Sequence, residues 1–342
     1  MRQEKIKKES EFEPIVSVIV PVLNGEATIE ALLESLLEID YPKEKIEIAV
    51  VDGNSTDKTT DIVAKYPVKL LIEKREGPNA ARNTGIKHTD SEIIAFTDSD
   101  CVVPRNWVKK IVSNFRDPKI GCVGGDVKGL DNDFLSKYAD KSIFPMIRTF
   151  EKRKELDSTG PLEGCPVGCN MSFRRKTLKD TGGFDESIRY SFEEDEIIER
   201  ICRIGYKLIL DPQVLVWHKH RSNLRDVLKQ SFKYGKGTGS LLKRPKNQKL
   251  VRRWFFINLL GLIQAVLTIG FVAFLIMTAT WEILFLVFLA TILLPLLGTM
   301  TLYAYKARQS KEYKSILIYP FIDFLRALAF CSGEICGFAK EK

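Results

Sequence analysis

Four short apolar runs, each followed by a turn and a helical pattern, organise the first hundred residues and constrain the fold. These runs, rich in the Val and Ile typical of buried strands, cover residues 15–22, 46–51, 68–73 and 93–96. Helices are expected at about 26–38 and through Arg82 and Ile86. Because parallel strands need crossover connections, usually helices, the pattern predicts an α/β fold with a mostly parallel open sheet and flanking helices.

Polar side chains follow three of these runs. Asp52 follows the second run, Arg75 the third, and Asp98-Ser99-Asp100 the fourth. The carboxyl ends of parallel strands meet at one sheet edge, where open α/β sheets bind ligands. Two carboxylates separated by one residue suit Mg²⁺ or Mn²⁺, which take other ligands from water and phosphate. A surface turn is the alternative for this triplet, but with Asp52 and Arg75 it indicates a nucleotide pocket.

The same segments resemble a known enzyme family. VIVPVLNG, VVDGNSTD, EGPNAARNTGI and FTDSD stand in the order and spacing of family 2 glycosyltransferases with the GT-A fold. The resemblance covers roughly residues 15–240. It implies an inverting, metal-dependent enzyme of the hexosyltransferase type, using a UDP- or GDP-sugar and Mn²⁺ or Mg²⁺.

The resemblance also assigns a donor site. The residues that would frame the nucleotide base are Pro21, Asn24 and Asp52. Asp98 would lie near the ribose and the metal, and Asp100 would ligate the metal. Arg75 and Arg82 are candidates for the diphosphate, because a guanidinium is a permanently charged, planar donor. A charge on a helix surface is the alternative for Arg82.

A catalytic base is expected in the acidic run Glu193-Glu194-Asp195, which follows Gly182-Gly183-Phe184-Asp185-Glu186. The resemblance makes Asp195 the base and Glu194 its neighbour in the acceptor site. A carboxylate beside other carboxylates in a first helical turn can accept a proton near neutrality. The spacing alone favours acidic residues that merely complement the helix macrodipole.

The acceptor side is assigned, by the same resemblance, to Gly168, Asn170, Gly183 and Phe184. An ordinary strand with small residues that allow close packing is the alternative for the first two. In related enzymes a histidine near His218 or His220 can complete the metal shell, and imidazole suits Mn²⁺. A phosphate contact or a strand end is the alternative for the histidines.

The segment Gln230-Ser231-Phe232-Lys233-Tyr234 stands where processive family members carry Gln-x-x-Arg-Trp. Lys and Tyr replace the Arg and Trp. This departure favours transfer of one sugar per encounter over polymer synthesis.

Two apolar segments, Trp254–Met277 and Ile283–Tyr305, contain no charged residue and exceed the ~20 residues that span a bilayer. They predict a transmembrane hairpin. Lysines and arginines precede the first and follow the second, whereas the link between them has none. The positive-inside rule therefore predicts a membrane protein with its catalytic domain on the cytoplasmic face. The basic residues could also bind anionic headgroups or a polyprenyl phosphate.

A third apolar segment, Ile316–Phe338, contains Asp323, Arg326 and Glu334 near one helical face. The pattern suits an amphipathic helix in the membrane interface or a helix packed against the other two. It could present a lipid acceptor to the active site or serve only as an anchor.

Composition agrees with this division. The net charge of +8 is explained by the clusters beside the membrane segments, and no nucleic-acid-binding motif accompanies it. Seven cysteines without a C-x-x-C pair, and a polar start without an apolar h-region, suit the cytoplasm. The predicted parts are a tail (1–14), the catalytic domain (15–240), a basic linker (241–253), the hairpin (254–305) and a C-terminal segment (306–342).

The expected function is transfer of a single sugar to a lipid-linked saccharide or another membrane-proximal hydroxyl. One alternative is a polyprenyl-phosphate sugar synthase, whose acceptor is the lipid phosphate itself and needs little help from a base. The other is a non-catalytic nucleotide-sugar-binding subunit of a glycosylation assembly. The base candidate Asp195 speaks against that last alternative, because a binding module needs no base.

Overall fold

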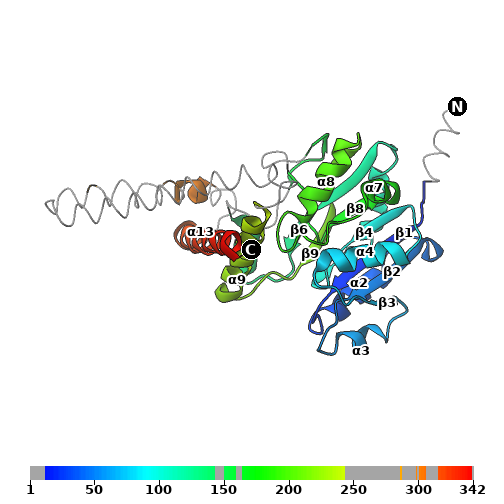
Figure 1. The fold of residues 1–342 in the computed structure, drawn as a ribbon, viewed down its shortest axis with the longest axis horizontal. Helices are drawn as coiled ribbons and strands as arrows, with labels where there is room; N and C mark the ends of the chain where they lie inside the picture. Colours follow the sequence, from blue (N-terminus) through cyan, green and yellow to red (C-terminus); the bar gives the residue numbers. More distant parts are fainter. Residues whose placement is uncertain are drawn as a thin grey trace. The chain divides into compact units, whose positions relative to one another are not determined.

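The computed structural model describes residues 12–142, 150–158, 164–242, 286, 298, 300–305 and 315–340 (Figure 1). The chain forms two compact units. One comprises Met1–Ser136 and Met146–His220, and the other comprises Lys137–Pro145 and Arg221–Lys342. The predicted catalytic domain extended to residue 240, whereas the first compact unit ends at His220.

The first unit is built on one mixed sheet with the order β3-β2-β1-β4-β8-β6-β9-β5, and β7 pairs with β9. Its strands are β1 (Val16–Val22), β2 (Ile46–Asp52), β3 (Lys69–Ile72), β4 (Ile93–Phe96), β5 (Cys101–Val102), β6 (Ile120–Gly129), β7 (Lys154–Leu156), β8 (Met171–Arg174) and β9 (Lys207–His218). Its helical segments are α2 (Ile29–Leu37), η1 (Lys43–Lys45), α3 (Thr59–Val63), α4 (Pro78–His88), α5 (Trp107–Asn114), α7 (Arg175–Thr181) and α8 (Glu193–Arg203). Helix α6 (Phe134–Lys141) crosses the boundary between the units.

Strands β1 to β4 are the four predicted apolar runs, and they pair in parallel as expected. Their register places Val22 opposite Asp52, so the ends of β1 and β2 lie together. Helix α2 covers one face of the sheet, and its apolar side chains recur at helical spacing: Ile29, Leu32, Leu33 and Leu36. The predicted α/β fold is confirmed.

The second half of the sheet departs from parallel order. Strand β8 lies between β4 and β6 and is antiparallel to both. The side chain of Asn170 fills the register shift beside Gly125: its Nδ2 donates to the carbonyl oxygens of Asp126 (2.7 Å) and Val214 (2.8 Å). Gly125 is required there, because a methyl group would overlap the Asn170 amide.

The second unit contains α9 (Leu224–Leu241) and α13 (Ser315–Lys340). Their backbones touch at four glycines, where any Cβ would overlap a carbonyl oxygen of the opposite helix: Gly235, Gly239, Gly333 and Gly337. Small residues spaced four apart allow this close approach.

The charged residues of α13 turn inward. Asp323 accepts hydrogen bonds from Tyr138 (2.6 Å), Ser142 (2.8 Å) and Tyr303, and Arg326 donates to the Tyr138 hydroxyl (2.7 Å). Glu334 is also buried. The charged stripe therefore packs within the unit and does not face water. Helix α13 packs against α9 and contacts Tyr303 of the predicted hairpin. Most of that hairpin lies outside the described residues, so the choice between the two alternatives stays a prediction.

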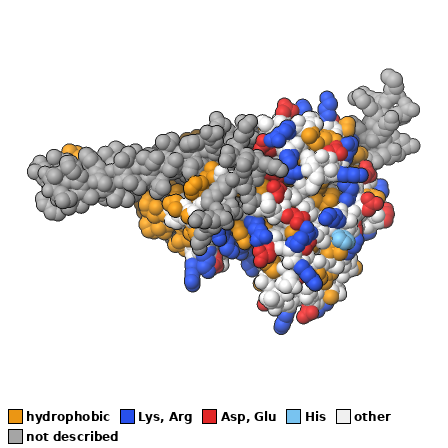
Figure 2. All heavy atoms as spheres, viewed as in Figure 1, with side chains coloured by type: hydrophobic (Ala, Val, Ile, Leu, Met, Phe, Trp, Pro, Cys, Tyr) orange, Lys and Arg blue, Asp and Glu red, His pale blue; other side chains and the backbone are white. Residues whose placement is uncertain are grey.

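The opposite side of α13 is apolar and exposed, and Figure 2 shows hydrophobic side chains gathered over this helix. Its exposed members are Leu317, Ile318, Phe321, Phe324, Leu328, Ile335 and Phe338. Within the described part of the chain, Ile316–Ala339 is the one helix long and apolar enough to cross a membrane. Of the predicted hairpin, the structure describes helical residues only at 286, 298 and 300–305; the rest lies outside the described residues.

Candidate functional site

The segments that follow β1 and β2 at their carboxyl ends are joined to each other by hydrogen bonds. The Asn24 side chain accepts the Thr56 amide (2.9 Å), and the Gly25 amide donates to Thr59 Oγ1 (2.8 Å). Asn24 itself has a left-handed backbone (φ 54°), which asparagine tolerates. Asn24 thus shapes the loops of the predicted base site.

Asp52 lies at the end of β2 with only 1% of its surface exposed. Its Oδ2 accepts the Ser55 amide (2.8 Å), whereas Oδ1 has no hydrogen-bond partner among the described residues. A buried acceptor without a partner is unfavourable, so this oxygen fits an N–H donor from a ligand. Pro21 is partly exposed in the adjacent strand β1.

The Asp98-Ser99-Asp100 triplet connects β4 to the short strand β5. Because β5 pairs with the end of β9, His218 lies beside the triplet, with its Nε2 3.4 Å from Asp100 Oδ1. The His218 and His220 Nδ1 atoms are 3.0 Å apart. Burial raises the pKa of Asp98, and the nearby charge of Asp100 raises it further. A bound cation would therefore stabilise the ionised carboxylates.

No three His, Cys, Asp or Glu side chains in the described ranges form a ready metal-binding cluster. Asp98 and Asp100 nevertheless offer hard oxygen donors from one turn, and His218 offers an imidazole from the end of β9. This donor set fits a divalent cation that takes its remaining ligands from water and substrate phosphates.

Arg82 on α4 is buried, with 4% of its surface exposed, so the alternative of a helix-surface charge is wrong. Its Nη1 donates to Asn79 Oδ1 (3.0 Å), and its guanidinium lies 5.5 Å from the centre of the Phe184 ring. Its Nε has no hydrogen-bond partner among the described residues. Its charge lowers the pKa values of three carboxyls, those of Asp98, Glu193 and Glu194, against the effect of burial.

Helix α8 brings its acidic first turn to this arginine. Burial is the main cause that raises the pKa of Glu193, to about 7, and of Glu194. Asp195 is partly buried in the same turn, and its charge raises the Glu194 pKa further. Gly168 completes the cluster, because a methyl group there would overlap both Glu194 Oε1 and Arg82 Nη2. The structure therefore brings Gly168, Arg82 and Glu194 together.

Arg75 forms ion pairs with two glutamates and is not part of the cluster around Arg82. It forms ion pairs with Glu73 (2.6 Å) and Glu186 (2.5 Å), and its hydrogen bonds to Glu73 lower the pKa of that carboxyl to about 2. Its side chain remains half exposed. The ion pairs join the loop after β3 to the loop before α8, and a diphosphate contact for Arg75 stays a prediction.

Residues 184–192, which lead into α8, are held against α4 by two asparagines. Asn83 bonds both the amide and the carbonyl of Phe184 (2.9 Å each), and Asn79 Nδ2 donates to the Asp185 carbonyl (2.9 Å). Within this loop Tyr190 and Phe192 have left-handed backbones, with φ of 75° and 63°. Such a conformation costs about 1–3 kcal/mol for a residue of this kind and marks functional sites.

The other residues expected on the acceptor side are mostly structural. Asn170 is buried and also accepts the Trp107 indole N–H (3.0 Å). The Phe184 ring is buried edge-to-face against Phe96 and Phe173. Gly183 has a left-handed backbone (φ 77°). Their place beside an acceptor stays a prediction.

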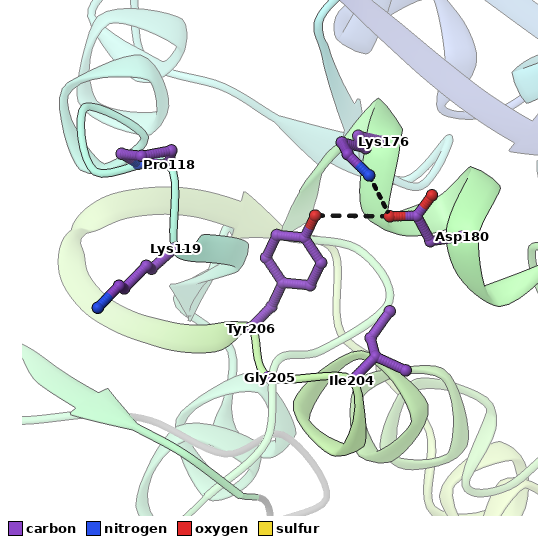
Figure 3. Close-up of a pocket in the computed structure, with 7 residues that line it drawn as sticks. All are labelled: Pro118, Lys119, Lys176, Asp180, Ile204, Gly205 and Tyr206. Atoms are coloured by element: carbon purple, nitrogen blue, oxygen red, sulfur yellow. Dashed lines mark hydrogen bonds and ion pairs between the residues drawn. The ribbon is translucent and has the colours of Figure 1, made fainter.

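A separate open hollow of about 540 Å³ lies near the amino end of strand β6 (Figure 3). It is lined by Pro118, Lys119, Lys176, Asp180, Ile204, Gly205 and Tyr206. It adjoins Ile120, the first residue of β6, and β6 runs in the same direction as β4 because both are antiparallel to β8. The hollow is therefore remote from the strand ends that carry Asp52 and Asp98.

Sequence reasoning missed Glu193 and Tyr190. The acidic run contained Glu193, but only the tertiary fold reveals its burial. Tyr190 carried no local signal, since a left-handed aromatic residue cannot be recognised from its neighbours.

Comparisons with known proteins identify the family of this chain. The family described as glycosyl transferase family 2 matches residues 17–182. Glycosyltransferase AglE of Haloferax volcanii is 30% identical over 233 residues, which cover 66% of this chain and 73% of AglE. A Methanococcus voltae protein is 22% identical over 241 residues, and the match covers 67% of this chain and 74% of the length of that protein. It is named dolichyl N-acetyl-alpha-D-glucosaminyl phosphate 3-beta-D-2,3-diacetamido-2,3-dideoxy-beta-D-glucuronosyltransferase. Two other relatives are longer, and the chain spans about half of their length.

Among solved structures, the mannosyltransferase PcManGT from Pyrobaculum calidifontis, in complex with GDP-Man and Mn²⁺, shares the fold. Its TM-score is 0.63 at 19% identity, and the match covers 100% of this chain and 94% of PcManGT.

Proposed function

Because the chain belongs to glycosyl transferase family 2, and is thus a glycosyltransferase, we propose that it transfers one sugar from a nucleotide sugar to a membrane-proximal hydroxyl. The acceptor is a lipid-linked saccharide or a similar membrane-bound glycan, and the anomeric configuration is inverted. The observation that carries this proposal is the clustering of Asp98, Arg82 and the α8 carboxylates at the carboxyl edge of the sheet. Arg82 thus lies close both to the residue proposed to bind the donor, Asp98, and to the carboxylates proposed to bind the acceptor.

The donor nucleotide binds over the cross-bonded loops after β1 and β2. Asp52 Oδ1 accepts an N–H of the base, which uracil and guanine both provide. Asp98 and Asp100, with His218, would hold the divalent cation, as the Mn²⁺ in PcManGT supports. Such an ion, when bound, stabilises the charge of the departing nucleoside diphosphate.

Arg82 adds a fixed positive charge between the donor aspartate and the α8 carboxylates. Its unpaired Nε is a buried donor suited to a phosphate oxygen. Buried charge of this kind stabilises a leaving group strongly, because no water competes with it.

Asp195 acts as the general base. It lies in the first turn of α8 beside Glu194, and it takes the proton from the attacking acceptor hydroxyl. The acceptor oxygen attacks opposite the leaving diphosphate in one step, so no enzyme nucleophile is needed and the configuration inverts.

The enzyme works at a membrane surface. The apolar outer side of α13 is unfavourable in water and matches a lipid environment. The name of the Methanococcus voltae relative, a transferase acting on a dolichyl-linked sugar, supports a lipid-linked acceptor. The predicted hairpin would keep the catalytic unit on the cytoplasmic face.

The test uses the full-length protein in detergent with a panel of UDP- and GDP-sugars, Mn²⁺ and a membrane lipid extract. Wild type should form a lipid-soluble sugar product that both Asp100→Ala and Asp195→Asn lose. Asp61→Asn, a change at an exposed carboxylate on α3, is the matched control and should retain activity. Loss in Asp100→Ala alone would instead indicate transfer to a lipid phosphate, which needs little help from a base. Wild-type turnover absent with every donor would contradict the proposal.

A further inference from the structure

Two aromatic residues directly before the catalytic helix adopt left-handed backbones. Elsewhere in the described ranges, the non-glycine residues with positive φ are Asn24 and Asn54, which tolerate this conformation. For Tyr190 and Phe192 the left-handed conformation is unfavourable, because bulky side chains clash with the backbone in it. Strain of this kind persists where the surrounding structure imposes it, and the asparagine contacts to α4 fix this loop at its start.

The strained turn has two results. It places the Tyr190 backbone close to Glu193, where its N–H lowers the pKa of that carboxyl against the larger effect of burial. It also turns the Tyr190 ring outward, so that 46% of the residue is exposed while the nearby Ile188 is buried. An exposed aromatic residue thus stands just before the first turn of α8, which carries Glu194 and Asp195.

We propose that Tyr190 is an acceptor-specificity residue whose ring stacks against a sugar ring of the acceptor. This inference rests on the proposed function and deepens it. One face of a pyranose ring presents C–H groups, which pack on an aromatic face, while the tyrosine hydroxyl remains in water. A bare polyprenyl phosphate has no ring beside its reacting oxygen and gains nothing from such a platform. Tyr190 therefore selects a lipid-linked saccharide over a lipid phosphate.

The test compares Tyr190→Gly, Tyr190→Phe and wild type as full-length proteins in detergent. Initial rates are measured with the active nucleotide sugar against two probes: alkyl glycosides with different sugar heads, and polyprenyl phosphate. Glycine removes the ring and also relieves the left-handed strain, so its midpoint of thermal unfolding should be at least that of wild type. Phenylalanine keeps the ring and loses only the hydroxyl.

For Tyr190→Gly we expect the KM for the alkyl glycoside to rise about tenfold while the KM for the nucleotide sugar stays unchanged. Tyr190→Phe should restore the wild-type KM. Ile204→Ala, at an equally exposed apolar residue beside the remote hollow, is the control and should match wild type.

An unchanged glycoside KM in Tyr190→Gly, with normal turnover, overturns this inference and leaves the proposed function standing. Wild-type transfer to polyprenyl phosphate as efficient as transfer to the glycosides overturns the inference as well. No transfer by wild type to either probe overturns the proposed function and the inference with it.

Discussion

The donor and acceptor halves of the site are built by different means. On the donor side, hydrogen bonds between backbone amides and side-chain oxygens join two adjacent loops, and asparagines occupy the left-handed positions. On the acceptor side, two crowded carboxyls, those of Glu193 and Glu194, share one buried arginine, and two aromatic residues adopt a strained turn. The first half is stable in itself, whereas the second depends on a balance of charges. Mutations should therefore be tolerated unequally across the site.

The largest effect is expected from Arg82→Ala, which leaves buried carboxyls without their cation. Breaking such an arrangement should lower the free energy of unfolding by about 3–5 kcal/mol and kcat/KM by roughly 10²–10³-fold. The loss of stability should be smaller at pH 5 than at pH 8, because Glu193, with a pKa of about 7, is protonated at pH 5. Denaturant unfolding at both pH values measures this, with the exposed Arg105→Ala as control. Equal losses for the two variants would contradict the role of Arg82 as a hub.

Glu193→Gln should remove a penalty that grows with pH. The folded-state pKa of Glu193, about 7, lies above its ordinary value of 4.5, so the folded state keeps the proton longer than the unfolded state. Stability contributed by this group is therefore present at low pH and lost as pH rises from about 4.5 through 7. Above pH 7 the variant should be more stable than wild type by at most roughly 3 kcal/mol.

Thermal unfolding between pH 5 and 8 checks this expectation. The exposed Glu38→Gln provides the comparison and should follow the wild-type profile. Parallel profiles for wild type and Glu193→Gln would show that Glu193 does not titrate in this range.

Gly168→Ala tests the closeness of the two halves. The added methyl group would push Glu194 away from Arg82, and a displacement of this size near reacting groups can reduce kcat by about 10². Gly53→Ala on the donor side is the matched variant, since its Cβ meets only ordinary contacts and the nearest atom is 3.4 Å away. Steady-state kinetics should show a large loss for the first and little for the second; comparable activities would remove the distinction between the halves.

The smallest effect is expected from Asp52→Asn. The asparagine oxygen can still accept the Ser55 amide, so the loop should keep its structure, but the atom facing the base becomes an N–H₂ donor. Affinity for the nucleotide should fall about tenfold. Titration calorimetry with UDP and with GDP measures the change and reveals which base the wild type prefers. A variant that binds as tightly as wild type would exclude a base contact for Asp52.

The sequence predicted the donor half better than the acceptor half. Strand ends and polar residues such as Asp52 and Asp98 follow directly from local patterns, because parallel strands bring their carboxyl ends together. The antiparallel insertion of β8 and the burial of Glu193 depend on contacts between distant segments. The packing of the Phe184 ring against Phe96 and Phe173 likewise joins distant segments, and no local pattern predicts it.

The same reasoning applies to the C-terminal helix. The spacing of Asp323 and Arg326 correctly indicated one charged face, but it could not say whether water or protein covered that face. The tyrosine hydroxyls that bind Asp323 come from Tyr138 and Tyr303, which lie 185 and 20 residues away in the chain.

The glycines where α9 and α13 touch fix an alignment as well as a distance. Glycines recur every four residues on each helix, so a shift by one, two or three positions would press a side chain into the opposing backbone. A slide by four residues, about 6 Å at the usual helical rise, would still place a residue with a side chain at one of the two glycine positions. Helices α9 and α13 are therefore expected to resist sliding along each other. Their glycines fix which residues of α9 lie opposite which residues of α13.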